Sequence, residues 1–216
     1  MDYIISTTLY LLKGTYTTLS LYFVTAIFSL PLGIIFAALQ FSMPKFVRYI
    51  FDIYAWIFRG TPLVLQLIFF YYGLPLMTNN MIAFPAFVSA AITFVLNYAA
   101  YLMEIFRSGI ESIEKGQYEA GFALNLSYRQ IMTRIILPQA IRRVLPPLSN
   151  EAINLVKDTA LVIVLGIGDL MLHARQILTR DYKLLPFFIA AIIYLLFTYI
   201  LVFVFRQLEK KYVIRN

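Results

Sequence analysis

The sequence contains no cysteine and a single histidine, and charged residues make up only 13% of it. Without cysteine, neither disulfides nor thiolate metal sites can form. His173 alone cannot supply the several ligands of a protein metal site, so we expect it to be an ordinary loop residue. Soluble domains carry about a quarter charged residues. The shortage of charge therefore argues against a soluble globular protein.

What the chain has in excess is apolar surface. It is 61% hydrophobic, and its mean hydropathy is +0.78. The apolar residues form unbroken runs of helical length rather than the short alternating segments of a membrane β-barrel. Helices satisfy their backbone groups internally and can therefore cross a bilayer. The sequence predicts an all-α integral membrane protein.

Five runs approach the roughly 20 apolar residues that a spanning helix needs. The second run is interrupted by the sequence RGTP, and the fourth is the most polar. We therefore expect about five transmembrane helices in a single domain that occupies residues 1–216. The expected spans are 15–40, 49–77, 85–106, 148–171 and 185–205.

The positive charges indicate which side of the membrane each loop occupies. Most Lys and Arg residues lie in the loops 41–48 and 107–146 and in the tail 206–216. Cytoplasmic segments of membrane proteins are enriched in these residues. We therefore expect the N-terminus outside, the C-terminus in the cytoplasm and the tail at the inner membrane surface. The net charge of +7 then needs no nucleic acid partner.

The loop 107–146 contains signals for a rigid helical structure. Apolar residues recur through 109–124, and Asn125 tolerates the left-handed conformation that ends helices. Ser127 and Gln130 have the spacing of a capping box, which starts a helix. We predict one helix over 109–124, a sharp turn, and a second helix running towards Pro138. This rigid pair of helices, about 109–138, is called the peg below. Its shape suits docking into a groove of a partner protein.

The segment GQYEAGFALNLSYRQIMTRIILPQAIRRVLPP, at 116–147, resembles the EAA loop of membrane permease subunits of bacterial ABC importers. The chain departs from the family pattern at Gly121, where the family has Ala, and at Asn125, where it has Gly. We expect Gly121 to loosen the first helix by about 1 kcal/mol if it is exposed. Both Asn and Gly accept the left-handed turn, so we expect the bend to persist.

Three further blocks are similar to the polar amino acid branch of this family. They are RGTPLVLQL at 59–67, AYLMEIFRSGIESIEKGQ at 100–117 and KDTALVIVLGIGDL at 157–170. The last departs from the family pattern at Ala160. The four blocks occur in the family's order and cover much of the chain between residues 59 and 170.

The resemblance implies that the loop is a coupling helix that docks into a cytoplasmic ATPase subunit. It further implies two ATP-binding subunits per complex, a second permease subunit that is identical or different, and an extracytoplasmic solute-binding protein that contacts 173–183. The chain would be a multi-pass protein of the bacterial inner membrane. The coupling residues are expected to be Glu119, Ala120, Gly121, Leu124, Asn125 and Ser127.

The chain itself contains no phosphate-binding loop of the pattern G-x-x-x-x-G-K-[ST]. We therefore expect it to have no cofactor and no enzymatic activity, with ATP and Mg²⁺ bound by the partner ATPase. No Ser/His/Asp set or cluster of metal ligands suggests a membrane-embedded enzyme. The open alternative is a self-contained secondary transporter or channel for small polar solutes, which would need no ATPase.

Polar residues inside the expected spans suggest a substrate cavity, because such residues are unfavourable in lipid. Helical spacing places Asn97, Tyr101 and Glu104 on one face, and Glu151, Asn154 and Asp158 on another. An acid-rich cavity favours basic amino acids. The expected substrate-binding residues are Thr61, Gln66, Asn97, Tyr101, Glu104, Asn154 and Asp158.

The same polar residues could instead hold the helices together. In that alternative, Glu104 or Asp158 pairs with Arg59 or Lys157, or Glu104 reaches the cytoplasmic interface. The RGTP break adds a further feature, because proline frees backbone groups that could then bind a polar solute.

Overall fold

The computed structural model describes residues 2–212, which form helices and no strands, as the all-α prediction requires. The α-helices are α1 (Asp2–Ser42), α2 (Lys45–Gly60), α3 (Leu63–Ile68), α4 (Leu74–Met77), α5 (Ala86–Glu111), α6 (Lys115–Ala123), α7 (Tyr128–Ile131), α8 (Leu137–Asp158), α9 (Leu170–Asp181) and α10 (Leu185–Tyr212). Short π-helical segments, Phe69–Gly73 and Met132–Ile136, join α3 to α4 and α7 to α8, and a 3₁₀ segment, Thr159–Leu165, follows α8. The end of the basic tail, 213–216, lies outside the described residues.

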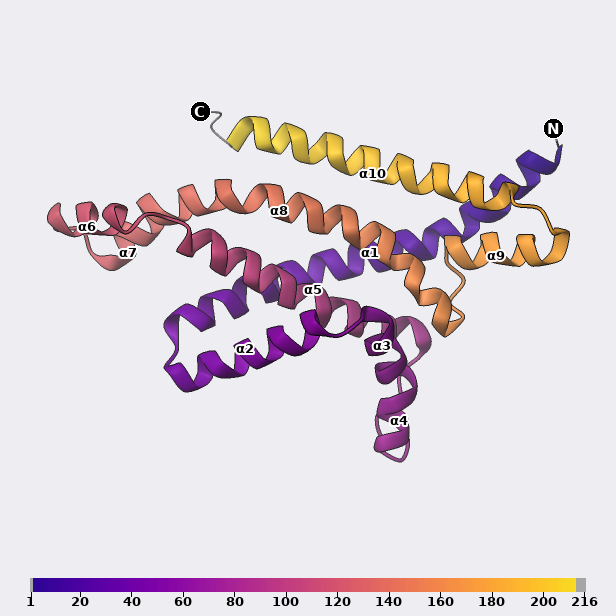
Figure 1. Ribbon diagram of the computed structural model, residues 1–216, viewed down its shortest axis with the longest axis horizontal. Helices are drawn as coiled ribbons and strands as arrows, with labels where there is room; N and C mark the ends of the chain where they lie inside the picture. The colour runs from indigo at the N-terminus through magenta and orange to yellow at the C-terminus, as the bar shows by residue number, and fades with distance from the viewer. Residues whose placement is uncertain (1, 213–216) are drawn as a thin grey trace.

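The long helices run along the long axis of the molecule (Figure 1). The start of α1 lies at one end of it, and α10 runs from that end towards the other. The short helices α6 and α7 lie at the end where α10 finishes, and α9 lies at the end where α1 begins. The loop 107–146 and the segment 173–183 are therefore on opposite sides of the bundle.

Three helices, α1, α5 and α10, are long and apolar enough to cross a membrane. The pair α2 and α3–α4 makes a fourth candidate if the bend between them lies within one span. The helix α8 runs beside α5 and α10 (Figure 1) but fails this test of composition. It carries five charged residues, Arg142, Arg143, Glu151, Lys157 and Asp158.

The bounds expected for the fourth span, 148–171, are wrong. The helix begins at Leu137 and ends at Asp158, and the apolar sequence after it forms the 3₁₀ segment. Gly166 ends that segment with φ = 69°, in the left-handed region that glycine adopts readily. Several apolar residues that suggested a continuing span, among them Val162, Leu165 and Ile167, instead pack in the core of the protein.

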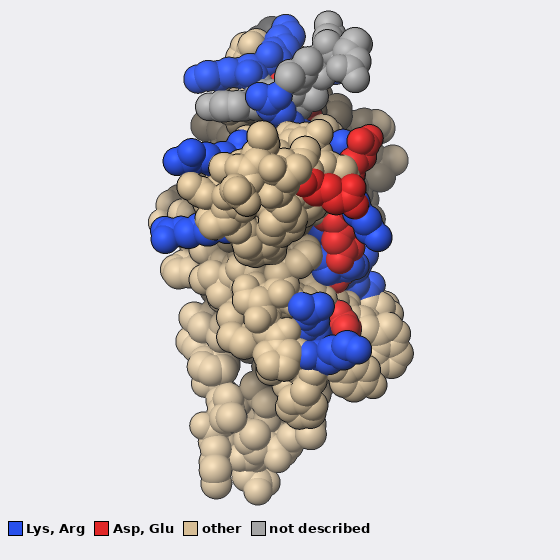
Figure 2. All heavy atoms as spheres, turned by 90° about the vertical axis from the view of Figure 1, so that its left-hand side faces the viewer, with Lys and Arg blue, Asp and Glu red and all other residues tan. Residues whose placement is uncertain are grey.

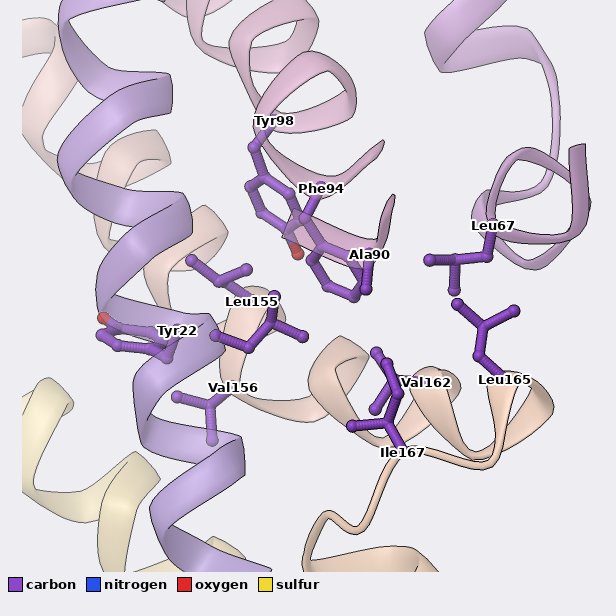
Figure 3. Packing of buried hydrophobic residues seen from close by; sticks show 11 residues of the cluster. Tyr22, Leu67, Ala90, Phe94, Tyr98, Leu155, Val156, Val162, Leu165 and Ile167 are labelled. Atoms are coloured by element: carbon purple, nitrogen blue, oxygen red, sulfur yellow. The ribbon is translucent and has the colours of Figure 1, made fainter. Parts of the chain in front are cut away.

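A hydrophobic cluster fixes the 3₁₀ segment against the neighbouring helices (Figure 3). Phe94 and Tyr98 of α5 stack with ring centroids 6.2 Å apart. Around them lie Leu67 of α3 and Val162 of the 3₁₀ segment, both fully buried. Because dense packing of this kind tolerates little movement, it fixes where α3, α5 and the end of α8 meet.

Candidate functional site

A cavity of about 460 Å³ lies where the bend after α2 faces α5 and α8. It brings together five of the seven expected substrate-binding residues: Thr61, Asn97, Tyr101, Asn154 and Asp158. Gln66 and Glu104 lie outside its lining. The remaining lining residues are Arg59, Gly60, Pro62, Leu63, Tyr98 and Glu151.

The RGTP sequence forms the bend itself. The helix α2 ends at Gly60, and Thr61 is extended, with φ = −115° and ψ = 146°. Pro62 accounts for this conformation, because proline disfavours a helical residue before it. The chain then turns by 103° into α3–α4. The turn places Arg59 and Thr61 in the cavity wall.

Two backbone oxygens at the bend, those of Phe58 and Thr61, accept hydrogen bonds from protein side chains. The Gln66 amide nitrogen donates to the carbonyl oxygens of Phe58 at 2.9 Å and Thr61 at 3.2 Å. The Asn97 amide nitrogen also donates to Phe58 O, at 2.9 Å, and to the Gln66 side-chain oxygen, at 3.0 Å. Gln66 therefore stabilises the bend, although its side chain does not line the cavity. These freed carbonyls are satisfied within the protein and are not left open for a solute.

Two carboxylates of α8 face the cavity. Asp158 accepts a 2.8 Å hydrogen bond from the Tyr98 hydroxyl, and Glu151 lies about two turns earlier on the same face. Among the described residues, neither carboxylate belongs to an ion pair, and the suggested pair between Asp158 and Lys157 does not form. Both carboxylates therefore remain available to a cation in the cavity.

Glu104 has a different environment. Its Oε2 atom lies 3.3 Å from Nη1 of Arg59 and 2.7 Å from Nη2 of Arg107. The side chain is only 16% exposed. The pairing with Arg59, which the sequence left open as an alternative, is thus present. Arg59 also lies over the Tyr101 ring, 5.5 Å from its centroid, in a cation–π contact.

Tyr98 and Leu63 are the cavity residues to which sequence reasoning gave no role, and Tyr98 is the polar one. It lies one position after Asn97 and therefore about 100° away from the face that carries Asn97, Tyr101 and Glu104. Only 3% of its surface is exposed, as expected for a core residue. The sequence signal for Tyr98 was its spacing of four residues from Phe94, which puts both side chains on one face of α5. That face packs in the hydrophobic core, so the spacing indicates a core residue rather than a site residue.

The second candidate region is the loop between α5 and α8. Asn125 has φ = 57°, so the predicted left-handed turn is present. The predicted capping box is also present: the Gln130 N–H donates to Ser127 Oγ, and the Ser127 N–H donates to the Gln130 side chain. A single helix over 109–124 is wrong, because α5 ends at Glu111 and α6 begins only at Lys115. A short link, 112–114, therefore separates α5 from α6.

Small apolar contacts hold the peg together. Ile113, Ile131, Ile136 and Ala140 form a buried cluster that joins the link before α6 and the helix α7 to the start of α8, and Tyr118 of α6 packs against it. Gly121 is buried within this region, and a Cβ added to it would lie 2.7 Å from Cγ1 of Ile131. The expectation for an exposed Gly121 therefore does not apply, because here the glycine permits close packing.

The outer surface of the peg combines polar and apolar groups. Of the expected coupling residues, Gly121 alone is buried, whereas Glu119, Ala120, Leu124, Asn125 and Ser127 are exposed. The large side chains of Phe122, Leu124 and Tyr128 are more than half exposed. Figure 2 views the molecule from this end and shows Lys and Arg side chains gathered there, together with Asp and Glu.

His173, expected in a loop, instead lies in α9 at the opposite end of the bundle. Its Nδ1 atom is 2.8 Å from the Asp169 carbonyl oxygen, and its ring centroid is 4.7 Å from that of Tyr10. Nearby, the hydrogen bond from Arg180 lowers the pKa of Asp181 below its ordinary value, and a hydrogen bond from Tyr3 acts in the same direction. The contacts of Tyr10 with His173 and of Tyr3 with Asp181 attach α9 to the start of α1.

Known proteins resemble the chain over nearly its whole length. The arginine transport system permease protein ArtQ of Bacillus subtilis is 41% identical over 203 residues, which cover 94% of this chain and 92% of ArtQ. The glutamine transport system permease protein GlnP of Escherichia coli is 41% identical over 156 residues, which cover 72% and 71% of the two chains.

Solved structures agree with this relationship. An amino acid ABC transporter crystallised with histidines matches with a TM-score of 0.88 and 33% identity, over 96% of both chains. The MetNI methionine ABC transporter, at 20% identity and a TM-score of 0.74, shares the fold over 94% of this chain. Residues 29–214 match the family described as binding-protein-dependent transport system inner membrane component. The chain therefore belongs to this family of multi-pass membrane permeases.

Proposed function

We propose that the chain is the permease subunit of an ATP-driven importer of amino acids, and that the cavity at the bend binds the substrate. The observation that carries this proposal is the set of charges around the cavity. Arg59 presents a guanidinium group, and Glu151 and Asp158 present two carboxylates outside any ion pair among the described residues. A free amino acid carries the complementary pair of charges, one carboxylate and one ammonium group.

The cavity favours substrates with an additional positive charge. One carboxylate suffices for the α-ammonium group, so the second is available to a cationic side chain. Thr61, Asn97 and Asn154 add hydrogen-bonding groups to the same walls. The relative named for arginine and the solved transporter with histidines support a basic amino acid, whereas the relatives named for glutamine represent the neutral alternative.

The peg between α5 and α8 is proposed to dock into the ATPase subunit. The family works with a binding protein, an ATPase and a second permease subunit. The exposed apolar side chains of Phe122, Leu124 and Tyr128 suit burial in a partner's groove. This assignment places the peg and the end of α10 in the cytoplasm, and the start of α1 and α9 outside. We propose two ATPase subunits per complex, with ATP and Mg²⁺ held by them.

The test is uptake of radiolabelled L-arginine into liposomes that contain the chain with its ATPase and binding protein. We expect ATP-dependent uptake that excess unlabelled L-lysine or L-histidine inhibits more strongly than L-glutamine. Asp158→Asn keeps the shape of the side chain but removes its charge, and should raise the half-saturating arginine concentration at least about tenfold. Uptake by the chain without any ATPase would contradict the proposal and support a self-contained transporter.

A further inference from the structure

Glu104 and the two arginines beside it are not explained by substrate contact, because Glu104 lies outside the cavity lining. The Glu104 carboxylate contacts both Arg107 and Arg59, but the two contacts differ in strength. Arg107 binds it through two atoms, Nη2 at 2.7 Å and Nε at 3.3 Å, whereas Arg59 binds it through Nη1 alone, at 3.3 Å. A two-point contact with a guanidinium is stronger and more rigid than a single one. Glu104 is therefore held mainly by Arg107.

Arg107 is itself fixed from its other side. Its Nη1 atom lies 2.7 Å from Oε2 of Glu111, one turn further along α5. Glu111 is 51% exposed, so solvent screens its charge, whereas Glu104 is only 16% exposed. Arg107 thus stays beside Glu104, and most of its charge acts on that carboxylate.

Arg59 keeps donors free for a second anion. A guanidinium has five N–H donors in one plane, and Glu104 engages only Nη1 of Arg59. Arg59 is 41% exposed and lines the cavity, with its position further restrained by the Tyr101 ring. Since the Glu104 carboxylate also binds Arg107, it neutralises the positive charge of Arg59 only in part. The remaining positive charge on Arg59 faces the cavity.

We propose that Arg107 is a positioning residue: it holds Glu104 as a loosely bound counterion of Arg59, which the carboxylate of the substrate replaces. The proposal rests on the proposed function of the cavity. Without Arg107, Glu104 would be free to bind Arg59 at two points, and the substrate would have to compete with it. Arg107 therefore sets substrate affinity without touching substrate.

The experiment measures arginine uptake against arginine concentration for the complete transporter in liposomes. Arg107→Leu should raise the half-saturating concentration about tenfold while the maximal rate stays within about twofold of wild type. Arg107→Lys keeps the charge but cannot make the two-point contact, and should recover only part of the affinity. Arg142→Leu removes an exposed arginine of α8 that lies outside this cluster, and should leave both parameters unchanged.

The decisive comparison is made with Glu104→Gln. If Arg107 acts through Glu104, Arg107→Leu should add no further change in the Glu104→Gln background. Equal effects of Arg107→Leu in both backgrounds, an unchanged half-saturating concentration, or a loss confined to the maximal rate would overturn the proposal. Wild-type transporter that takes up neither arginine nor glutamine would instead refute the proposed function, and the positioning role with it. Recovery of each variant in complex with the ATPase by size exclusion confirms that it folds.

Discussion

The Tyr98 hydroxyl donates a 2.8 Å hydrogen bond to the Asp158 carboxylate and so joins α5 to the last residue of α8. Tyr98 belongs both to the hydrophobic cluster and to the cavity wall. Asp158 is followed directly by the 3₁₀ segment, at the point where the helix ends. The contact therefore fixes the orientation of a cavity carboxylate by attaching it to a residue of the buried hydrophobic cluster.

Tyr98→Phe should weaken both stability and substrate binding. The change removes the hydroxyl and leaves a half-buried carboxylate without its donor, which costs about 1–3 kcal/mol. We expect a lower melting temperature for the detergent-solubilised transporter and a higher half-saturating arginine concentration. Tyr101→Phe is the matched control, because it keeps the ring over Arg59 and removes a hydroxyl of the same cavity. Equal behaviour of the two variants would show that the bond to Asp158 has no special role.

The sequence was sufficient to predict features that depend on neighbouring residues. The bend at Pro62, the left-handed Asn125 and the capping box at Ser127 are local, because each follows from the conformational limits of a few residues. Helical spacing likewise brought Asn97 and Tyr101 to one wall of the cavity.

Features that depend on tertiary contacts were not predictable in the same way. The 3₁₀ segment after Asp158 is as apolar as a span, and only its packing against Leu67 distinguishes it. Similarly, the partition of Glu104 between Arg59 and Arg107 requires the distance between two helices that are far apart in the chain. The break between α5 and α6 has no glycine or proline to mark it.

Gly121→Ala should destabilise the peg, although alanine is the better helix former by about 1 kcal/mol. The added Cβ would lie 2.7 Å from Cγ1 and 2.9 Å from Cδ1 of the fully buried Ile131. Overpacking of this kind costs about 1–3 kcal/mol. Limited proteolysis of the loop should therefore be faster in the variant. Adding Ile131→Val removes Cδ1 but keeps Cγ1, so it should restore resistance only in part. Cleavage of the double variant no slower than that of Gly121→Ala would contradict the packing explanation.

Asn125 offers a test of backbone conformation. At φ = 57°, Gly should be tolerated, whereas Val should cost about 1–2 kcal/mol because its Cβ crowds the backbone in the left-handed region. We expect Asn125→Gly to retain ATP-dependent uptake and Asn125→Val to lose most of it, with similar amounts of both in the membrane. Asn125→Ala should fall between them. If Val and Gly transported equally well, the turn would not be needed to present the peg.

Glu119→Lys tests whether the exposed surface of the peg is the docking surface. Glu119 is exposed on α6, beside Phe122, so the substitution reverses a charge on that surface without disturbing the buried cluster. Misplaced charge at an interface opposes association. We therefore expect normal insertion but loss of ATP-dependent uptake and of co-purification with the ATPase. Glu114→Lys, at the start of α6 next to its joint with α5, is the control and should remain active. Full uptake by Glu119→Lys would mean that the ATPase binds elsewhere.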